Sequence, residues 1–241
     1  MRTPTLFLAA MLVATPACAI VIRPDRDDAE YLELATRYPS SVALPGPAAG
    51  GGVLIAPRWV LTSTSRAKAL QGAKPPARIP FGGNAHEIQS IHLLPAGKDG
   101  AASDVALVLL RTGVRAVEPN LLYRERDEGG KAIVVVGHGS ADRKARASIN
   151  TVDRVEARTL GLRVKPLDDA SDLQGSATPA DIGGPAFVEV SGAIFVAGIL
   201  TSIAAPWETY ARVSEYVPWI EAVMLDVETK EMNARMDPDR R

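Results

Sequence analysis

The sequence predicts an all-β fold, either a closed barrel or a sandwich, with a helix near each end. From Pro39 to about Ser214, short runs rich in Val, Ile and Leu are separated by Gly, Pro, Asp and Asn, which is typical of strands joined by turns. The strands expected from these runs are 52–55, 59–62, 88–93, 105–110, 132–136, 150–156, 186–190 and 193–201. Their regular spacing favours a barrel or a sandwich over alternating βαβ units.

Two segments outside these runs have helical spacing. Residues 25–38 place acidic residues first and then apolar residues three and four apart, and Pro39 ends the pattern. Residues 213–227 carry apolar side chains at helical spacing, which predicts an amphipathic helix docked on the strands. From Glu228 to Arg241 the chain is mostly charged and polar, so we expect a flexible tail there.

The segment 1–19 has the composition of a secretory signal peptide. Arg2 precedes an apolar run from Leu6 to Val13, and small residues follow up to Ala19. We therefore expect cleavage after Ala19 and a mature protein that is secreted or periplasmic. Cys18 is the only cysteine, so that mature chain has no disulfide. Lipidation of Cys18 is the alternative, but residues 15–17 lack the large aliphatic residue that such sites usually carry.

The composition is that of an ordinary globular protein, with 46% hydrophobic and 23% charged residues and a formal net charge of -1. A nearly neutral chain gives no electrostatic reason to expect nucleic acid or an anionic membrane as a partner. After the signal, no segment has the ~18 uncharged apolar residues of a membrane-spanning helix. We expect a soluble monomer whose partner, if it has one, is a protein or peptide.

Four segments carry recognisable motifs in sequence order: 51–66, 103–110, 181–185 with 198–199, and 209–220. Together they resemble the trypsin-like serine protease family. Gly51 to Arg66 is similar to the strands that lead to the family's Leu-Thr-Ala-Ala-His-Cys. Ser103 to Leu110 resembles the family's Asp-Ile-Ala-Leu-Leu. Asp181 to Pro185, followed by Gly198-Ile199, resembles Gly-Asp-Ser-Gly-Gly-Pro and the next strand. Thr209 to Ile220 resembles the family's last strand and terminal helix.

The resemblance covers residues 20–222 and is to a bacterial secreted member. It implies one domain, 20–227, built of two six-stranded Greek-key β-barrels of the trypsin-like fold with a C-terminal helix. The boundary between the two lobes is expected near residues 112–130. Gly50 and Arg66 stand where the family has a disulfide beside its catalytic histidine, which agrees with a cysteine-free mature chain.

The resemblance also implies that the catalytic triad has degenerated. Ser65 occupies the position of the histidine, Asp104 that of the aspartate, and Ile182 that of the nucleophilic serine. Isoleucine has no nucleophilic atom, and a serine hydroxyl has no appreciable basicity near neutral pH. We therefore expect no peptide cleavage. Asp104 is expected to remain as a hydrogen-bonded carboxylate that accepts from Ser65 and nearby amides.

The loop around Ile182 carries two further expectations. The oxyanion loop, Ala180 to Gly183, has an alanine where the family has a glycine, so we expect its Cβ to resist the backbone turn that aims the amide. Signal cleavage would leave Ile20-Val21 at the terminus, similar to activated family members, whose α-ammonium pairs with the aspartate beside the nucleophile. Asp181 is the matching residue, so we predict an ion pair between the Ile20 ammonium and Asp181. The alternative is a flexible terminus and an Asp181 that caps local amides.

The primary specificity pocket implied by the resemblance is also altered. By offset from Asp181, its base lies near Ser176, where arginine- or lysine-specific members have aspartate. Its wall, matched through Thr201, carries Ile203 and Glu208 at positions where the family usually has glycine. Side chains at these two positions are expected to narrow the slot.

None of the three histidines matches the catalytic location. His86 and His92 lie on or beside a surface strand, and His138 stands where the family has a tryptophan between two glycines. We expect structural or solvent-exposed roles for all three. His86 and His92 are six residues apart, which is not the spacing of two that would place ligands on one strand face, so no metal and no cofactor are expected.

Three functions are compatible with these residues. The first is an exported, catalytically inactive protease homologue whose loops bind a protein or peptide. The second is an atypical hydrolase that uses Ser63, Thr64 or Ser65 with Asp104, although it lacks a positioned base. The third is a structural or carrier protein of the cell envelope, with the charged segment after Glu228 as its contact region.

Overall fold

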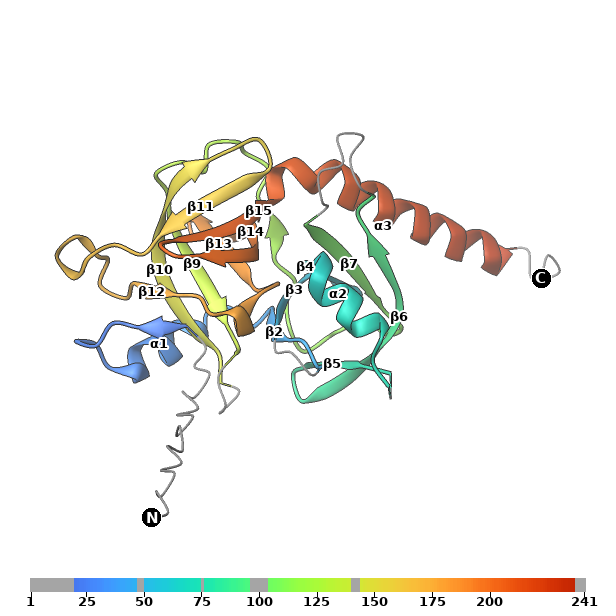
Figure 1. Ribbon diagram of the computed structural model, residues 1–241. Coiled ribbons are helices and arrows are strands. Elements are labelled where there is room, and N and C mark those ends of the chain that lie inside the picture. The colour runs from blue at the N-terminus through green and yellow to red at the C-terminus, as the bar shows by residue number, and fades with distance from the viewer. Residues whose placement is uncertain (1–19, 47–49, 75, 96–103, 140–143, 237–241) are drawn as a thin grey trace, which may run out of the picture.

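A computed structural model describes residues 20–46, 50–74, 76–95, 104–139 and 144–236. Two barrel-like sheets lie side by side, and a C-terminal helix, α3, starts beside the second barrel and runs over the first (Figure 1). The strands of the first sheet are β2 (Ser41–Ala43), β3 (Gly51–Ala56), β4 (Trp59–Ser63), β5 (Arg78–Phe81), β6 (Asn84–Leu93) and β7 (Val105–Leu110). Those of the second are β8 (Leu121–Leu122), β9 (Ala132–Gly137), β10 (Arg146–Val155), β11 (Thr159–Arg163), β13 (Pro185–Val190), β14 (Ala193–Ala204) and β15 (Trp207–Arg212).

The first barrel has the strand order β2-β3-β4-β7-β6-β5. β7 is buried at every position, which explains its uninterrupted apolar sequence, and it pairs with β4 along its length. β5 was not expected from the sequence. It is a short edge strand with alternating burial that contains Pro80, a residue that edge strands tolerate and central strands do not.

The second barrel is a closed ring of six strands. The order is β13-β9-β10-β11-β15-β14, and β13 also pairs with β14, which closes the ring. The two-residue β8 adds a seventh, parallel strand to β14. β11 was missed in the sequence because it is short and Gly161 interrupts its apolar pattern. The prediction of two six-stranded barrels is confirmed.

The chain crosses from the first barrel to the second between β7 and β8. Asn120 links the two barrels there: its amide N–H donates to Leu54 O at 3.0 Å, and its side-chain Nδ2 donates to Ile194 O at 3.0 Å. Beyond β8, in the loop that leads to β9, the buried Glu128 accepts hydrogen bonds from Arg212 and Ser214, where β15 meets α3. Buried polar groups that are all paired hold this junction together.

Three helices lie outside the barrels. α1 (Asp28–Ala35) begins at Asp27, whose side chain caps it, and Arg146 on β10 forms an ion pair with Asp28 at 2.6 Å. α2 (Thr64–Gln71) directly follows β4, and a hydrogen bond from the Arg66 amide to the Ser63 hydroxyl at 3.4 Å closes its first turn.

The C-terminal helix α3 (Val213–Met236) is longer than expected. The segment 228–236 is helical, so the expectation of a flexible tail from 228 onward is wrong for these residues. Glu231 pairs with Arg58 on the first barrel at 2.7 Å, and Lys230 pairs with Asp226 one turn earlier. Among the described residues, no helix has both the length and the apolar character needed to cross a membrane.

Candidate functional site

The segments that carry Ser65 and Ile182 come from different barrels and meet at their junction. Gly51 on β3 donates its amide N–H to Ile182 O at 2.9 Å, and Thr62 on β4 donates its hydroxyl to Gly51 O at 2.7 Å. Ser65 lies in the first turn of α2, three residues after Thr62. The fold therefore brings the start of α2 next to the loop after Asp181, as the resemblance implies.

Gly183 is required by the backbone of this junction. Its φ is +88°, and a Cβ on it would lie 2.5 Å from both Gly51 O and Thr62 Oγ1. The turn and the close approach of the two barrels both exclude a side chain here. This is a structural reason for the glycine that needs no catalytic role.

The hydroxyl of Ser65 is exposed and its hydrogen-bond partner is Ser63, with the two Oγ atoms 3.1 Å apart. Asp104 contributes its backbone oxygen to the Thr64 amide at 3.3 Å. Among the described residues no hydrogen bond joins Ser65 to the Asp104 carboxylate, so that expectation is wrong. A serine side chain is shorter than an imidazole and stays with the cap of its own helix. Burial raises the pKa of the Asp104 carboxyl, and the charge of Arg158 partly offsets this shift.

The side chain of Ile182 is half-buried and packs against the core of the second barrel, which includes Ile20 and Ala177. Ala180 lies just before it in a 3₁₀ turn, η2 (Pro179–Asp181), which begins after Thr178. The altered residues of the expected oxyanion loop thus form a short helical turn followed by an aliphatic side chain.

Asp181 is 1% exposed and accepts four hydrogen bonds. Its Oδ2 accepts from the backbone nitrogen of Ile20 at 3.2 Å, from Thr178 N at 2.9 Å and from Thr178 Oγ1 at 2.8 Å. Its Oδ1 accepts from the amide of Gly139 at 3.0 Å. A buried carboxylate needs such partners, and the Ile20 nitrogen is one of them.

Ile20 sits in a tight socket and is 2% exposed. A Cβ on Gly175 would lie 2.5 Å from Ile20 Cγ2, and a Cβ on Gly137 would lie 2.4 Å from Asp181 Oδ1. The residues after Ile20 form β1 (Val21–Ile22), which pairs with β12 (Gly175–Ser176). The socket and the strand pairing place the Ile20 nitrogen beside Asp181.

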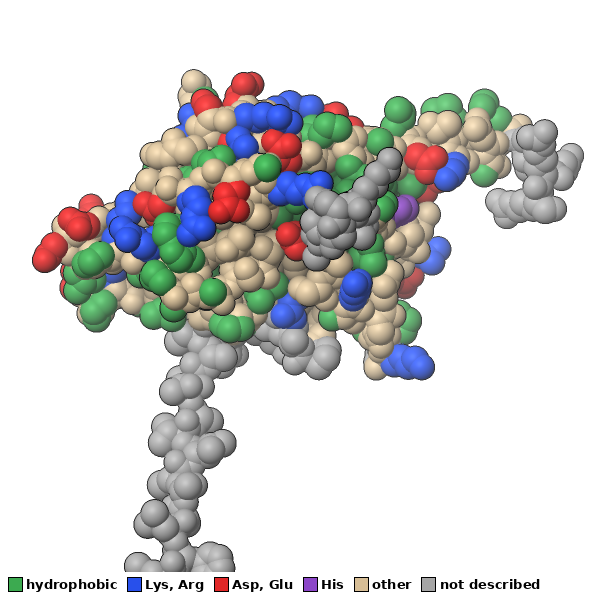
Figure 2. All heavy atoms as spheres, turned by 45° about the horizontal axis from the view of Figure 1, so that its top comes forward, with side chains coloured by type: hydrophobic (Ala, Val, Ile, Leu, Met, Phe, Trp, Pro, Cys, Tyr) green, Lys and Arg blue, Asp and Glu red, His purple; other side chains and the backbone are tan. Residues whose placement is uncertain are grey.

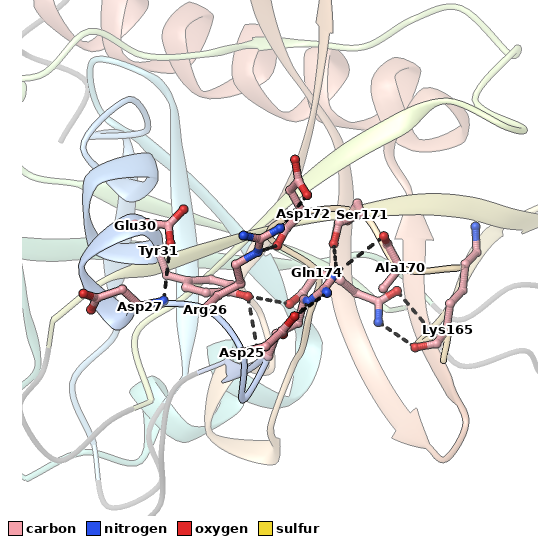
Figure 3. A network of polar contacts seen from close by, with 11 residues as sticks. Asp25, Arg26, Asp27, Glu30, Tyr31, Lys165, Ala170, Ser171, Asp172 and Gln174 are labelled. Carbon is pink, nitrogen blue, oxygen red and sulfur yellow. Dashed lines mark hydrogen bonds and ion pairs between the residues drawn. The ribbon is translucent and has the colours of Figure 1, made fainter. Parts of the chain in front are cut away.

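A polar network continues this attachment and is shown in Figure 3. Tyr31 on α1 donates its hydroxyl to Gln174 O at 2.9 Å, and Arg26 pairs with Asp172 at 2.8 Å. The Gln174 side chain in turn binds both backbone groups of Lys165, donating to its oxygen at 2.8 Å and accepting from its nitrogen at 3.1 Å. The segment after Ile20 is therefore fastened to the loop that leads to Ser176.

Glu208 fills the position of the expected specificity slot. It is 2% exposed, and its Oε1 accepts from Ser176 Oγ at 3.0 Å and from Ala177 N at 2.6 Å. Its Oε2 accepts from the Tyr210 hydroxyl at 2.9 Å. Burial raises the pKa of this carboxyl, the hydrogen bonds oppose the shift, and the nearby charge of Asp181 adds to it.

The other two pocket residues lie on β14. Ile203 is paired in register with Glu208 and packs half-buried against the same core as Ile182. Thr201 donates its hydroxyl to Thr209 O at 3.0 Å across the neighbouring strand. Sequence reasoning named Ser176, Thr201, Ile203 and Glu208, but missed Tyr210 and Ala177 as partners of the Glu208 carboxylate.

Arg66 takes the space at which the resemblance places a disulfide. A Cβ on Gly50 would lie 2.3 Å from Arg66 Cδ and 2.9 Å from Ile182 O, so the guanidinium stem lies directly against this glycine. Burial lowers the pKa of the Arg66 guanidinium. One long side chain thus packs the two segments together where no cysteine is present.

The histidines bind hydroxyl groups. His86 Nδ1 lies 3.2 Å from Thr112 Oγ1, His92 Nε2 lies 2.9 Å from Ser90 Oγ, and His138 Nε2 lies 2.9 Å from Ser41 Oγ. No set of three His, Cys, Asp or Glu side chains that could hold a metal ion occurs within the part of the chain that the structure describes.

His138 gives a testable pH dependence. Burial lowers its pKa from 6.5 to about 4. Since the folded pKa lies below the unfolded one, the stability that the neutral ring contributes is present above pH 6.5 and lost as the pH falls towards 4. We expect unfolding free energy to fall by ~1–3 kcal/mol across this window. The variant His138→Gln should flatten that part of the curve in urea titrations at fixed pH, and an unchanged slope would contradict the assignment.

Comparison with solved structures agrees with the fold. No protein-family model and no curated protein matches the chain. Among solved structures, a scabies mite inactivated protease paralogue, S-I1, superposes with a TM-score of 0.61 at 17% sequence identity, over 78% of this chain and 95% of that one. At this identity the likeness shows the fold alone, and that fold is trypsin-like.

Proposed function

We propose that the chain is an exported protein of the trypsin-like fold that binds a protein or peptide partner without cleaving it. The observation that carries this proposal is Ile182. Its aliphatic side chain stands at the position matched to the nucleophile and packs on the barrel core, so no atom there can attack a carbonyl. The mite protein, an inactivated protease paralogue, is an example of this fold without catalysis and supports the inactive part of the proposal.

Two further features support the absence of catalysis. Ser65, at the position matched to the base, holds a hydroxyl bound to Ser63, and a hydroxyl pair provides no general base near neutral pH. The Glu208 carboxylate lies between Ser176 and Tyr210, at the position matched to the specificity pocket, and a side chain there opposes entry of a substrate side chain. The first feature opposes the chemical step, and the second independently opposes access of the substrate.

Figure 2 shows acidic and basic side chains interspersed over the face that it presents. This mixture fits a formal net charge of -1 and gives no single-sign surface on that face for a polyanion. This face therefore does not favour a nucleic acid as the partner.

The inactive assignment is tested by activity of the purified protein. We expect no turnover of a mixed peptide library and no labelling by a fluorophosphonate probe, because neither a nucleophile nor its base is positioned. Ser63→Ala and Ser65→Ala are the matched control variants. Labelling of the unmodified protein that either substitution abolishes would instead establish the alternative, an atypical hydrolase that uses the start of α2.

Export adds a prediction about the terminus. Cleavage after Ala19 would turn the Ile20 nitrogen, 3.2 Å from Asp181 Oδ2, into an ammonium, and charge-assisted hydrogen bonds are roughly twice as strong as neutral ones. A protein that starts at Ile20 should therefore melt about 2–4 °C above one with a single extra residue before it, for a gain of ~1 kcal/mol. Equal melting temperatures would refute insertion of the ammonium, and mass spectrometry of the exported chain locates the terminus.

A further inference from the structure

We propose that a hollow beside β8 binds an extended peptide segment in which a bulky apolar residue is followed by a lysine or arginine. The hollow has a volume of about 390 Å³, within the range of roughly 300–1,000 Å³ that is usual for ligand sites. Its lining includes Leu121, Leu122, Tyr123, Glu125, Val190 and Phe195. The inference rests on the proposed binding function and assigns a surface and a partner chemistry to it.

The floor of the hollow is the exposed end of the second barrel's core. β14 lies between β13 and β8, and Phe195 is in register with Val188 on one side and Leu121 on the other. Tyr123 meets Phe195 with ring centroids 6.0 Å apart in an edge-to-face arrangement. Both aromatic side chains belong to or pack on the barrel core, so the floor is rigid and apolar.

The hollow lies away from the residues matched to the triad. β13 starts at Pro185, directly after the loop that carries Ile182, and ends at Val190 on the rim of the hollow. A strand rises about 3.4 Å per residue, so roughly 17 Å of strand separates the two places. A ligand here would therefore contact neither Ile182 nor Glu208.

The apolar lining reaches the strands on two sides of β14, which favours an extended ligand. Leu121 is 67% exposed and Val190 is 38% exposed, on the strands that flank β14. A compact molecule that covered only the floor at Phe195 would leave both side chains in water. A peptide crossing from β8 to the end of β13 covers both, and large apolar side chains that cluster on a surface mark such contacts.

The charges of the rim select the partner. Arg124 is paired with Glu221, and Lys131 is paired with Asp127 at 3.1 Å. Glu125 is exposed, and no hydrogen bond or ion pair involves it within the described part of the chain. The rim thus presents one uncompensated negative charge next to an apolar floor, which a basic residue beside an apolar one complements.

The test is a nuclear magnetic resonance titration of the ¹⁵N-labelled full-length protein with acetyl-Ser-Leu-Phe-Lys-Ser-amide, and with the same peptide carrying Glu in place of Lys. The Lys peptide should shift the amides of residues 121–125 and 190–195 in the millimolar range. Leu121→Ser should weaken its binding about fivefold and Val190→Ser about threefold, since each removes apolar contact area. Val155→Ser is the matched control, because Val155 is also 38% exposed and lies on another strand.

A charge exchange tests the selectivity. Glu125→Lys should weaken the Lys peptide about threefold and favour the Glu peptide by a similar factor, as expected for one exposed ion pair. Binding of both peptides to the unmodified protein with equal affinity, or no shifts in the hollow throughout the millimolar range, would overturn the proposal. Cleavage of the peptide during the titration, with the hollow shifts intact, would refute the non-catalytic function and leave this site standing.

Discussion

Replacing Asp181 with alanine is expected to lower the free energy of unfolding by about 3–5 kcal/mol, because a buried donor left without an acceptor costs about 1–3 kcal/mol. The substitution removes the acceptor of four donors: the Ile20 nitrogen, the amide and hydroxyl of Thr178, and the amide of Gly139. Local relaxation of the structure keeps the total loss below the sum of the costs of the four separate donors. Urea unfolding with a linear extrapolation measures the change.

Asp172→Ala is the matched control for this variant. The Asp172 side chain is 87% exposed and pairs with Arg26 on the surface, so its loss is expected to change stability by less than about 1 kcal/mol. If the two alanine variants unfold at the same urea concentration, Asp181 does not hold the N-terminal segment in the way that its contacts indicate.

The second large effect is expected at the junction between the loop that follows β8 and the start of α3. Glu128 is 1% exposed and pairs with Arg212 at 2.7 Å, and the Ser214 hydroxyl donates to the same carboxylate at 2.7 Å. Glu128→Leu leaves the Arg212 guanidinium buried without this partner. Breaking a buried ion pair on one side costs about 3–5 kcal/mol, and we expect a loss of that size in urea unfolding.

The double variant Glu128→Leu with Arg212→Met distinguishes the effect of charge pairing from the effect of side-chain packing. It removes both charges, so it should recover most of the stability that Glu128→Leu loses. Arg37→Ala, which breaks the half-exposed pair of Arg37 and Glu189, is the surface control and should cost less than about 1 kcal/mol. A double variant as unstable as the single one would show that side-chain shape, and not charge pairing, determines how much this junction contributes to stability.

Several strands of the barrels could be predicted because a strand that is buried on both faces has a continuous apolar run in its local sequence. β7, for example, is six consecutive apolar residues, all buried. β5 and β11 have no such run: one contains a proline and the other a glycine, and their pairing with β6 and β15 is a tertiary property. The spacing of apolar residues and the composition of a segment indicate which positions are buried, but they do not identify the strand with which the segment pairs.

The end of α3 shows the same limit for charged segments. Residues after Val227 are mostly charged and polar, which composition alone treats as a solvated tail. The ion pair of Glu231 with Arg58 joins residues far apart in sequence and anchors the helix to the first barrel. Nothing in the local sequence of either residue identifies the other.

For the candidate site, the resemblance names residues but not their contacts. The resemblance placed Ser65, Ile182, Ser176 and Glu208, and the fold brings the first two segments together and the last two into hydrogen bonding. The pairing of Ser65 with Ser63 depends on side-chain length and helix capping, which the motif does not report. The Glu208 carboxylate needs Tyr210 and Ala177 as partners, and these emerge only from the register of β14, β15 and β12.

The most direct measurement of the central claim is the intact mass of the protein after incubation with an activated acyl ester. Acylation of a serine or threonine oxygen needs a base beside it, and the structure offers an isoleucine and a pair of serine hydroxyls instead. Lysine and terminal amines react with such an ester without a catalytic site, so we predict that the folded protein gains no more acyl groups than the denatured chain and that none of them is on an oxygen. A single acyl group on the folded protein, mapped to Ser63, Thr64 or Ser65, would contradict the account.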